Sequence, residues 1–124
     1  MKFKEPVLAD QFNDSRLHPV IRAAANIIDS VVLIHKHTYP NATAGEFTIT
    51  SISRPESVGS YHSKWQALDS RTYDWDLTLK RKVSAFLTAL SSQTRDKFQF
   101  EYEPNKRRPD SDPHLHIEFD DDSI

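Results

Sequence analysis

A chain of 124 residues with a formal net charge of −2 and no cysteine has the size of one domain built around one hydrophobic core. The nearly neutral charge gives no bulk attraction to nucleic acid or to an anionic membrane surface. The absence of cysteine excludes disulfides, thiolate-bound zinc and a cysteine nucleophile. We therefore expect a single domain over residues 1–124, a monomer without nucleic-acid or membrane partners.

Residues 1–14 are of mixed polarity and predict an irregular N-terminal arm, with a short strand at 6–8. The first residues lack the apolar core of a secretion signal, and no stretch is long and apolar enough to span a membrane. We expect a product that is cytoplasmic at synthesis and reaches the cell wall or periplasm only when another factor releases it.

Two stretches have the three- and four-residue apolar spacing of amphipathic helices. The first starts near residue 15, accommodates Pro19 in its first turn and ends by Tyr39, which precedes a proline. The second begins at Asp74 or Asp76 as N-cap and stops near residue 92. The residues predicted to be buried are Leu17, Val20, Ile21, Ala24, Ile27, Ile28, Val31, Val32, Leu79, Val83, Phe86, Leu87 and Leu90. We expect the side chains of His18, His35 and His37 at the surface.

Four segments read as strands, because they are rich in β-branched and aromatic residues or alternate in polarity. They are residues 47–52, 67–72, 98–102 and 114–119. The segments 42–46, 53–59 and 104–112 read as loops, and 120–124 as a frayed acidic tail. This order predicts an α+β domain in which two main helices cover one face of a small antiparallel sheet. His114 and His116 would project from the opposite face.

Three residue types that bind divalent cations lie where these elements can bring them together. His62 precedes the second strand, Asp69 lies on it, and His116 lies on the last strand. Two imidazoles and one carboxylate leave the fourth position of a tetrahedral ion open to water, as in catalytic zinc sites. The chain has six histidines, so a coincidental spacing in a metal-free domain is the competing interpretation. Mn²⁺, Co²⁺ and Ni²⁺ are alternatives to Zn²⁺.

The segment from Ser60 to Asp69, Ser-Tyr-His-Ser-Lys-Trp-Gln-Ala-Leu-Asp, resembles the Ser-x-His-x-x-Gly-x-Ala-x-Asp signature of the D-alanyl-D-alanine carboxypeptidase family of zinc peptidases. That family includes the L-alanyl-D-glutamate endopeptidases of phage endolysins. Residues 50–55, Thr-Ser-Ile-Ser-Arg-Pro, are similar to its Thr-Ser-x-x-Arg-Ser stretch. His114-Leu115-His116 resembles the closing motif of lysostaphin-type peptidases and of the hedgehog zinc domain. The resemblance covers roughly residues 47–119.

This resemblance implies a hedgehog-like peptidase fold with Zn²⁺ held by His62, Asp69 and His116. It also implies that Arg54 stabilises the oxyanion of the tetrahedral intermediate, and that His114 either hydrogen-bonds this oxyanion or orients a neighbour.

The catalytic acid departs from the family pattern, in which it stands three residues before the last zinc ligand. Proline occupies that position here, so Asp112 or Asp110 is the expected general base. Ser60, Tyr61 and Trp65 are the expected substrate-binding residues of the cleft, although Trp65 stands where the family has glycine and cannot share its φ freedom.

The resulting expectation is a zinc-dependent peptidase that hydrolyses a peptide bond of bacterial peptidoglycan stem peptides next to a D-amino acid. A carboxypeptidase and an endopeptidase are both compatible with the motifs, and a phage or viral lysis enzyme fits a chain without a signal or a wall-binding module. The alternative is a zinc-bearing domain of the same fold that binds without catalysis, which the displaced acid favours.

Overall fold

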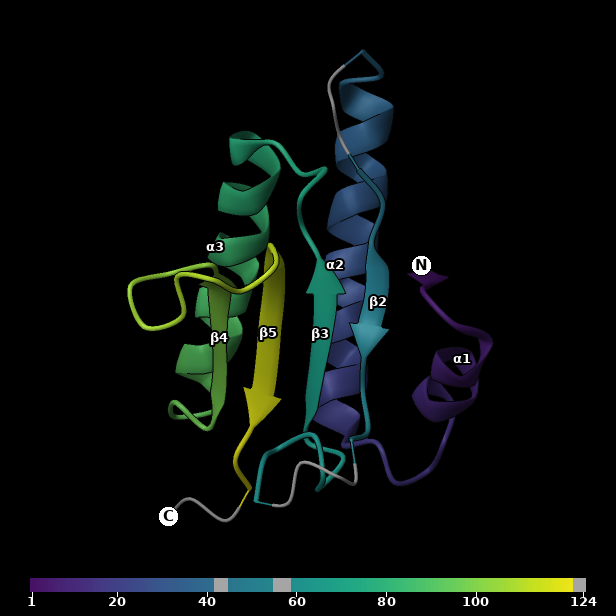
Figure 1. Cartoon of the computed structure of the whole chain (residues 1–124). Coiled ribbons are helices and arrows are strands. Elements are labelled where there is room, and N and C mark those ends of the chain that lie inside the picture. The colour runs from purple at the N-terminus through teal and green to yellow at the C-terminus, as the bar shows by residue number, and fades with distance from the viewer. Residues whose placement is uncertain (42–44, 55–58, 122–124) are drawn as a thin grey trace.

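The computed structural model describes residues 1–41, 45–54 and 59–121. Within these ranges the chain is α+β, with three helices and a five-stranded sheet (Figure 1). The helices are α1 (Pro6–Phe12), α2 (Pro19–Thr38) and α3 (Leu77–Gln93). The strands are β1 (Lys2–Phe3), β2 (Thr48–Ser51), β3 (Ala67–Arg71), β4 (Phe98–Glu103) and β5 (His114–Phe119). None of these helices has the length and apolar content needed to cross a bilayer.

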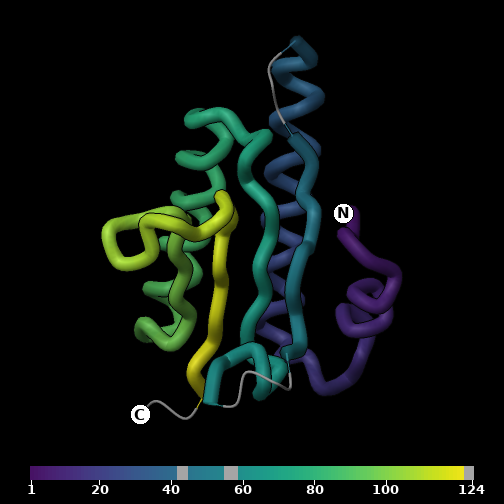
Figure 2. Tube along the Cα trace, viewed as in Figure 1, coloured from purple at the N-terminus to yellow at the C-terminus, as the bar shows by residue number. Residues whose placement is uncertain are grey.

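The sheet has the strand order β1-β2-β3-β5-β4, and the traces in Figures 1 and 2 show β5 between β3 and β4. Neighbouring strands are antiparallel except β1 and β2, which are parallel. The expectation of a purely antiparallel sheet is therefore wrong for this first pair. A parallel pair needs a long crossover connection, and α1 and α2 together supply it.

The N-terminal arm is ordered, contrary to the expectation of an irregular segment with a strand at 6–8. Backbone hydrogen bonds from Lys2 N to Phe47 O (2.8 Å) and from Lys4 N to Ile49 O (2.9 Å) hold β1 against β2. Helix α1 follows with a proline in its first turn, and it buries Leu8 and Phe12, which are one helical turn apart. This apolar pair was the missed sequence signal.

Helices α2 and α3 cover one face of the sheet, as expected (Figure 1). The core between these layers contains Ile21, Ala24, Ile28, Val32, Leu68, Leu79, Val83, Leu87, Leu115 and Ile117. The N-cap of α3 is Asp76, whose Oδ1 accepts a hydrogen bond from Leu79 N (2.7 Å). Ile27 on α2 is 37% exposed, so its predicted burial is wrong. The predicted burial of Phe86, which is 56% exposed, is wrong as well. It lies on α3 one position before the buried Leu87, beside rather than on the core-facing stripe.

His35 is also misplaced by the sequence-based prediction, because its side chain is only 1% exposed. Its Nε2 lies 3.1 Å from Asp76 Oδ2, and its Nδ1 lies 3.3 Å from the ammonium nitrogen of Lys82. Lysine can only donate, so Nδ1 accepts and Nε2–H donates to the carboxylate. The imidazole therefore connects the end of α2 to the beginning of α3. His18 is half-buried as the N-cap of α2, whereas His37 is exposed as expected.

The beginning of the acidic tail is anchored rather than frayed. Tyr61 Oη lies 3.1 Å from Asp120 Oδ2, and Asp120 N donates to Lys97 O (2.9 Å). Asp121 accepts from the side-chain amide of Gln66. Residues 122–124 of the tail, residues 42–44 of the loop predicted at 42–46 and residues 55–58 of the loop predicted at 53–59 lie outside the described ranges.

Candidate metal centre

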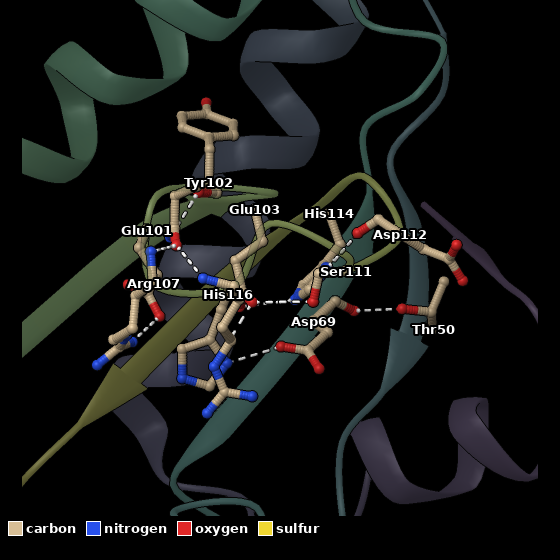
Figure 3. A network of polar contacts seen from close by, with 12 residues as sticks. Thr50, Asp69, Glu101, Tyr102, Glu103, Arg107, Ser111, Asp112, His114 and His116 are labelled. Carbon is tan, nitrogen blue, oxygen red and sulfur yellow. Dashed lines mark hydrogen bonds and ion pairs between the residues drawn. The ribbon is translucent and has the colours of Figure 1, made fainter.

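The candidate site lies on the sheet face opposite to α2 and α3, where β5 meets its two neighbours. Directly paired residues of antiparallel strands point to the same face, so the register aligns side chains in rows across β3, β5 and β4. The two rows are Asp69–His116–Glu101 and Arg71–His114–Glu103. Leu115 and Ile117 alternate with the histidines and point into the core. Figure 3 shows the polar side chains gathered over β3 and β5.

A tight loop before β3 carries the third candidate ligand. Successive backbone hydrogen bonds, from Ser63 N to Ser60 O (3.2 Å) and from Trp65 N to His62 O (3.3 Å), wind residues 60–66 into turns. Trp65 adopts φ +61°, the left-handed conformation that glycine would take at no steric cost. The guanidinium carbon of Arg16 lies 4.3 Å from the centre of its ring. The loop thus turns with a positive φ despite the tryptophan, and it directs His62 at the sheet.

Asp69 is the centre of this group. Its Oδ1 lies 2.7 Å from His116 Nδ1, and its Oδ2 lies 3.3 Å from His62 Nε2 and 3.6 Å from a terminal guanidinium nitrogen of Arg54. Burial by itself would raise the pKa of this carboxyl, but the hydrogen bond to His116 and the close approach of His62 outweigh burial and hold the pKa well below its usual range. The carboxylate therefore stays ionised at every physiological pH.

His62 is held in the tautomer that a metal ligand needs. Its ring is 2% exposed, and Nδ1 lies 2.8 Å from the carbonyl oxygen of Ile52, which can only accept. Nδ1 is therefore the protonated nitrogen, and in the neutral ring Nε2 carries a lone pair. That buried Nε2 makes no hydrogen bond within the described ranges, although Asp69 Oδ2 is 3.3 Å away. Two acceptors cannot face each other at this distance, so a proton on Nε2 or a bound metal ion must join the ring to the carboxylate.

His116 is held in a matching way by two carboxylates. Nδ1 faces Asp69 at 2.7 Å, and Nε2 lies 2.9 Å from Glu118 Oε1. Burial opposes charge on this ring, but the hydrogen bonds to Asp69 and Glu118 raise its pKa to about 9. A metal ion that replaces the proton on Nδ1 would leave Nε2–H donating to Glu118, the usual second contact of a ligating histidine.

The three ligand atoms have the separation that a small cation requires. They lie within 4.8 Å of one another, and a tetrahedral ion with bonds of about 2.1 Å needs neighbouring ligands roughly 3.4 Å apart. Small side-chain rotations would bring the ligand atoms to this spacing. His62, Asp69 and His116 can therefore hold a divalent ion, and the donor set of two nitrogens and one oxygen suits zinc.

An open cavity of about 400 Å³ lies beside these candidate ligands, so a small molecule could reach an ion held by them. It is lined by Arg54, Gly59, Ser60, Tyr61, His62, Asp69, Glu101, Glu103, Arg107, Arg108, Ser111, His114, His116 and Glu118. Most of these side chains are charged or polar, so the cavity suits a hydrophilic substrate better than an apolar ligand.

The remaining predicted site residues fall into three groups. Arg54, His114, Ser60 and Tyr61 line the cavity. Trp65 lines a neighbouring hollow with Arg16, Ser53 and Ser63. Asp110 and Asp112 are exposed and are not among the lining residues. The backbone oxygen of Asp112, rather than its carboxylate, contacts His114 Nδ1 (2.7 Å).

The structure supplies three cavity carboxylates that the sequence analysis did not assign to the site. Glu103 is 6% exposed, and its Oε2 lies 3.0 Å from His114 Nε2. Its Oε1 accepts from Ser111 Oγ (3.0 Å) and lies 3.7 Å from Arg108 Nε. Glu101 pairs with Arg107, and Glu118 with His116. Period-two alternation along β4 and β5 puts these glutamates on the histidine face, which was the available signal.

No protein-family model, curated protein or solved structure matches this chain.

Proposed function

We propose that this chain is a zinc-dependent peptidase that hydrolyses peptide bonds of peptidoglycan stem peptides. The observation that carries the zinc site is the buried Nε2 of His62, which makes no hydrogen bond within the described ranges and faces the Asp69 carboxylate with His116 on its other side. The resemblance of residues 60–69 to the signature of cell-wall zinc peptidases supports the substrate class. The hydrophilic cavity beside the ligands supports a peptide rather than an apolar ligand.

His62 Nε2, Asp69 and His116 Nδ1 would hold the ion. Zn²⁺ bound there would polarise a peptide carbonyl and lower the pKa of a water molecule at its open position toward about 7. Ile52 O and Glu118 fix the far nitrogens of the two imidazoles, so both rings keep their ligating tautomer. The loop and the two strands thereby pre-organise the donors.

Glu103 is the proton acceptor that the geometry favours over Asp112 and Asp110. It is a buried carboxylate on the cavity wall, and it is held by Ser111 and His114. Glu103 pairs with His114, which is two residues from His116 on β5. At about 3.4 Å per residue, the two positions are about 7 Å apart along the strand. The glutamate side chain and one water molecule can bridge this distance. It would take the proton of the attacking water and give it to the leaving amine as the carbon–nitrogen bond breaks.

Arg54 can stabilise the oxyanion that would form on the carbonyl oxygen. Arg54 extends into the cavity with a terminal nitrogen 3.6 Å from Asp69, and its remaining N–H groups can donate to the developing charge. His114 Nε2 faces Glu103, so His114 orients the proton acceptor. Loss of one such oxyanion donor typically lowers kcat by about 10²–10³-fold.

The test is release of new amino groups from purified peptidoglycan and from synthetic stem peptides by the zinc-loaded protein. We expect Glu103→Gln to bind zinc with unchanged affinity and to lose at least about 10²-fold in kcat, whereas Asp110→Asn and Asp112→Asn keep wild-type rates. Loss of activity in Asp112→Asn with full activity in Glu103→Gln would overturn the assignment of the proton acceptor. Zinc binding by a wild-type protein that cleaves no substrate would favour the rival interpretation, a binding domain without catalysis.

A further inference from the structure

Two adjacent arginines on the loop between β4 and β5 line the same cavity as the metal ligands. Arg107 pairs with Glu101, and Arg108 Nε lies 3.7 Å from Glu103 Oε1. Both arginine side chains are more than half exposed. A guanidinium has five N–H donors, so an ion pair through one nitrogen leaves donors for a second carboxylate. Figure 3 shows Arg107 beside Glu101, next to His116.

The loop that carries these arginines is ordered by its own hydrogen bonds. Asn105 Oδ1 accepts from the backbone N–H groups of Arg107 (3.0 Å) and Arg108 (2.9 Å), and Asn105 Nδ2 donates to Tyr102 O (3.2 Å). Ser111 N donates to Arg108 O (3.4 Å), and the Ser111 hydroxyl binds Glu103. The two guanidinium groups are thus attached to a backbone that is already folded over the β4 side of the cavity. Less conformational entropy is lost when such a loop binds a ligand.

The charge of the occupied cavity suits an anion. Its lining contains four carboxylates (Asp69, Glu101, Glu103, Glu118) and three guanidinium groups (Arg54, Arg107, Arg108). A bound divalent cation changes this balance from an excess of one negative charge to an excess of one positive charge. Asp69 and Glu118 offset the charge of the ion, and Glu101 and Glu103 offset the charges of Arg107 and Arg108, so the positive excess is that of Arg54. The cavity therefore attracts an acidic peptide once the ion is bound.

We propose that Arg107 and Arg108 form a subsite that binds a carboxylate of the substrate peptide, on the β4 side of the metal and close to the scissile bond. This inference rests on the proposed function and extends it, because it makes the enzyme selective for peptides with an acidic group near the cleaved bond. The carboxylate is either the C-terminus of the peptide or the α-carboxylate of a γ-linked glutamate. Both sources present the planar group that an arginine fork binds.

Binding is measured by calorimetry on the zinc-loaded Glu103→Gln variant, in which turnover does not interfere. The first probe pair is diacetyl-L-lysyl-D-alanyl-D-alanine as free acid and as C-terminal amide. The second pair is L-alanyl-γ-D-glutamyl-L-lysine amide with its glutamate α-carboxylate either free or amidated. We expect at least tenfold tighter binding of the acid in one pair, and the pair that discriminates identifies the source of the carboxylate.

The double substitution Arg107→Gln and Arg108→Gln should reduce this preference below threefold without changing zinc affinity. The variant with lysine at both positions should retain part of this preference, because lysine keeps the positive charge but lacks the planar guanidinium that binds a carboxylate with two hydrogen bonds. Arg81→Gln, an exposed position on α3, is the matched control and should leave the preference intact. Equal binding of acid and amide in both pairs, a preference that survives the double glutamine change, or no binding of any probe would overturn the subsite. Cleavage of peptides without acid selectivity would leave the proposed function standing, whereas absence of zinc binding would refute that function first.

Discussion

Raising the pH of the metal-free protein should remove the proton that joins Asp69 to His116, and with it part of the stability. The pKa of His116 is raised to about 9 from an ordinary value of 6.5, because its hydrogen bonds to Asp69 and Glu118 outweigh the effect of burial. A folded-state pKa above the unfolded one means that the contribution is complete below about pH 6.5 and disappears as the pH rises through about 9. At about 1.4 kcal/mol per pKa unit, the loss is at most about 3.5 kcal/mol.

The lowered pKa of Asp69 and the raised pKa of His116 arise from the same ion pair. The stabilisation by this pair is therefore counted only once. The lowered pKa of Asp69 gives a contribution that is present above about pH 4 and is lost as the pH falls further. We therefore expect greatest stability of the metal-free pair between about pH 4 and 6.5. Urea unfolding in excess chelator at pH 6, 7.5, 9 and 10 measures the high-pH side. His116→Gln should largely remove the fall in the free energy of unfolding above pH 6, while His37→Gln at an exposed position should not. A wild-type stability that stays constant from pH 6 to 10 would refute the assigned hydrogen bonds.

Three further predictions follow from contacts around the core and the ligands. Glu118→Gln should weaken zinc binding by about 10–100-fold in a chelator competition, because the ring of His116 loses its charged acceptor, while Glu101→Gln should change it by less than about threefold. The apparent zinc affinity of the wild type should rise about tenfold per pH unit between pH 6.5 and 8.5, because the metal displaces one proton from His116; an affinity independent of pH would contradict this. His35→Ala should lower the free energy of unfolding by about 2 kcal/mol, since it leaves Asp76 and Lys82 without their buried partner, whereas His37→Ala should cost less than about 0.5 kcal/mol.

Periodicity predicted the parts of the fold in which one side of an element meets the core. The last strand was predicted with the observed bounds, His114–Phe119, because apolar and polar residues alternate through all of it. The helix after Asp76 followed equally from its cap and apolar stripe. The N-terminal helix was missed because seven residues contain a single buried apolar pair, too short a pattern to separate from an irregular arm.

The candidate ligands could be predicted because a loop motif and a strand motif each have a fixed spacing, and pairing of β3 with β5 brings them together. The proposed proton acceptor could not be predicted in this way. Sequence distance from His116 favoured Asp112 and Asp110, whereas Glu103 reaches the cavity through the β4–β5 register, which depends on the intervening loop. His35 was assigned to the surface for a similar reason. Its partners Asp76 and Lys82 are distant in sequence. Only the packing of α2 against α3 brings them to the imidazole and satisfies its two nitrogens.

The metal content of untagged protein tests the central claim most directly. After dialysis against a slight excess of zinc and removal of unbound metal, we expect one zinc ion per chain by mass spectrometry of the elements. Asp69→Asn and His62→Gln should each reduce the content well below one, while His114→Gln, on the neighbouring row, should retain it. A wild-type protein that keeps no zinc, or an Asp69→Asn variant that binds as much as the wild type, would contradict a metal centre at these three side chains.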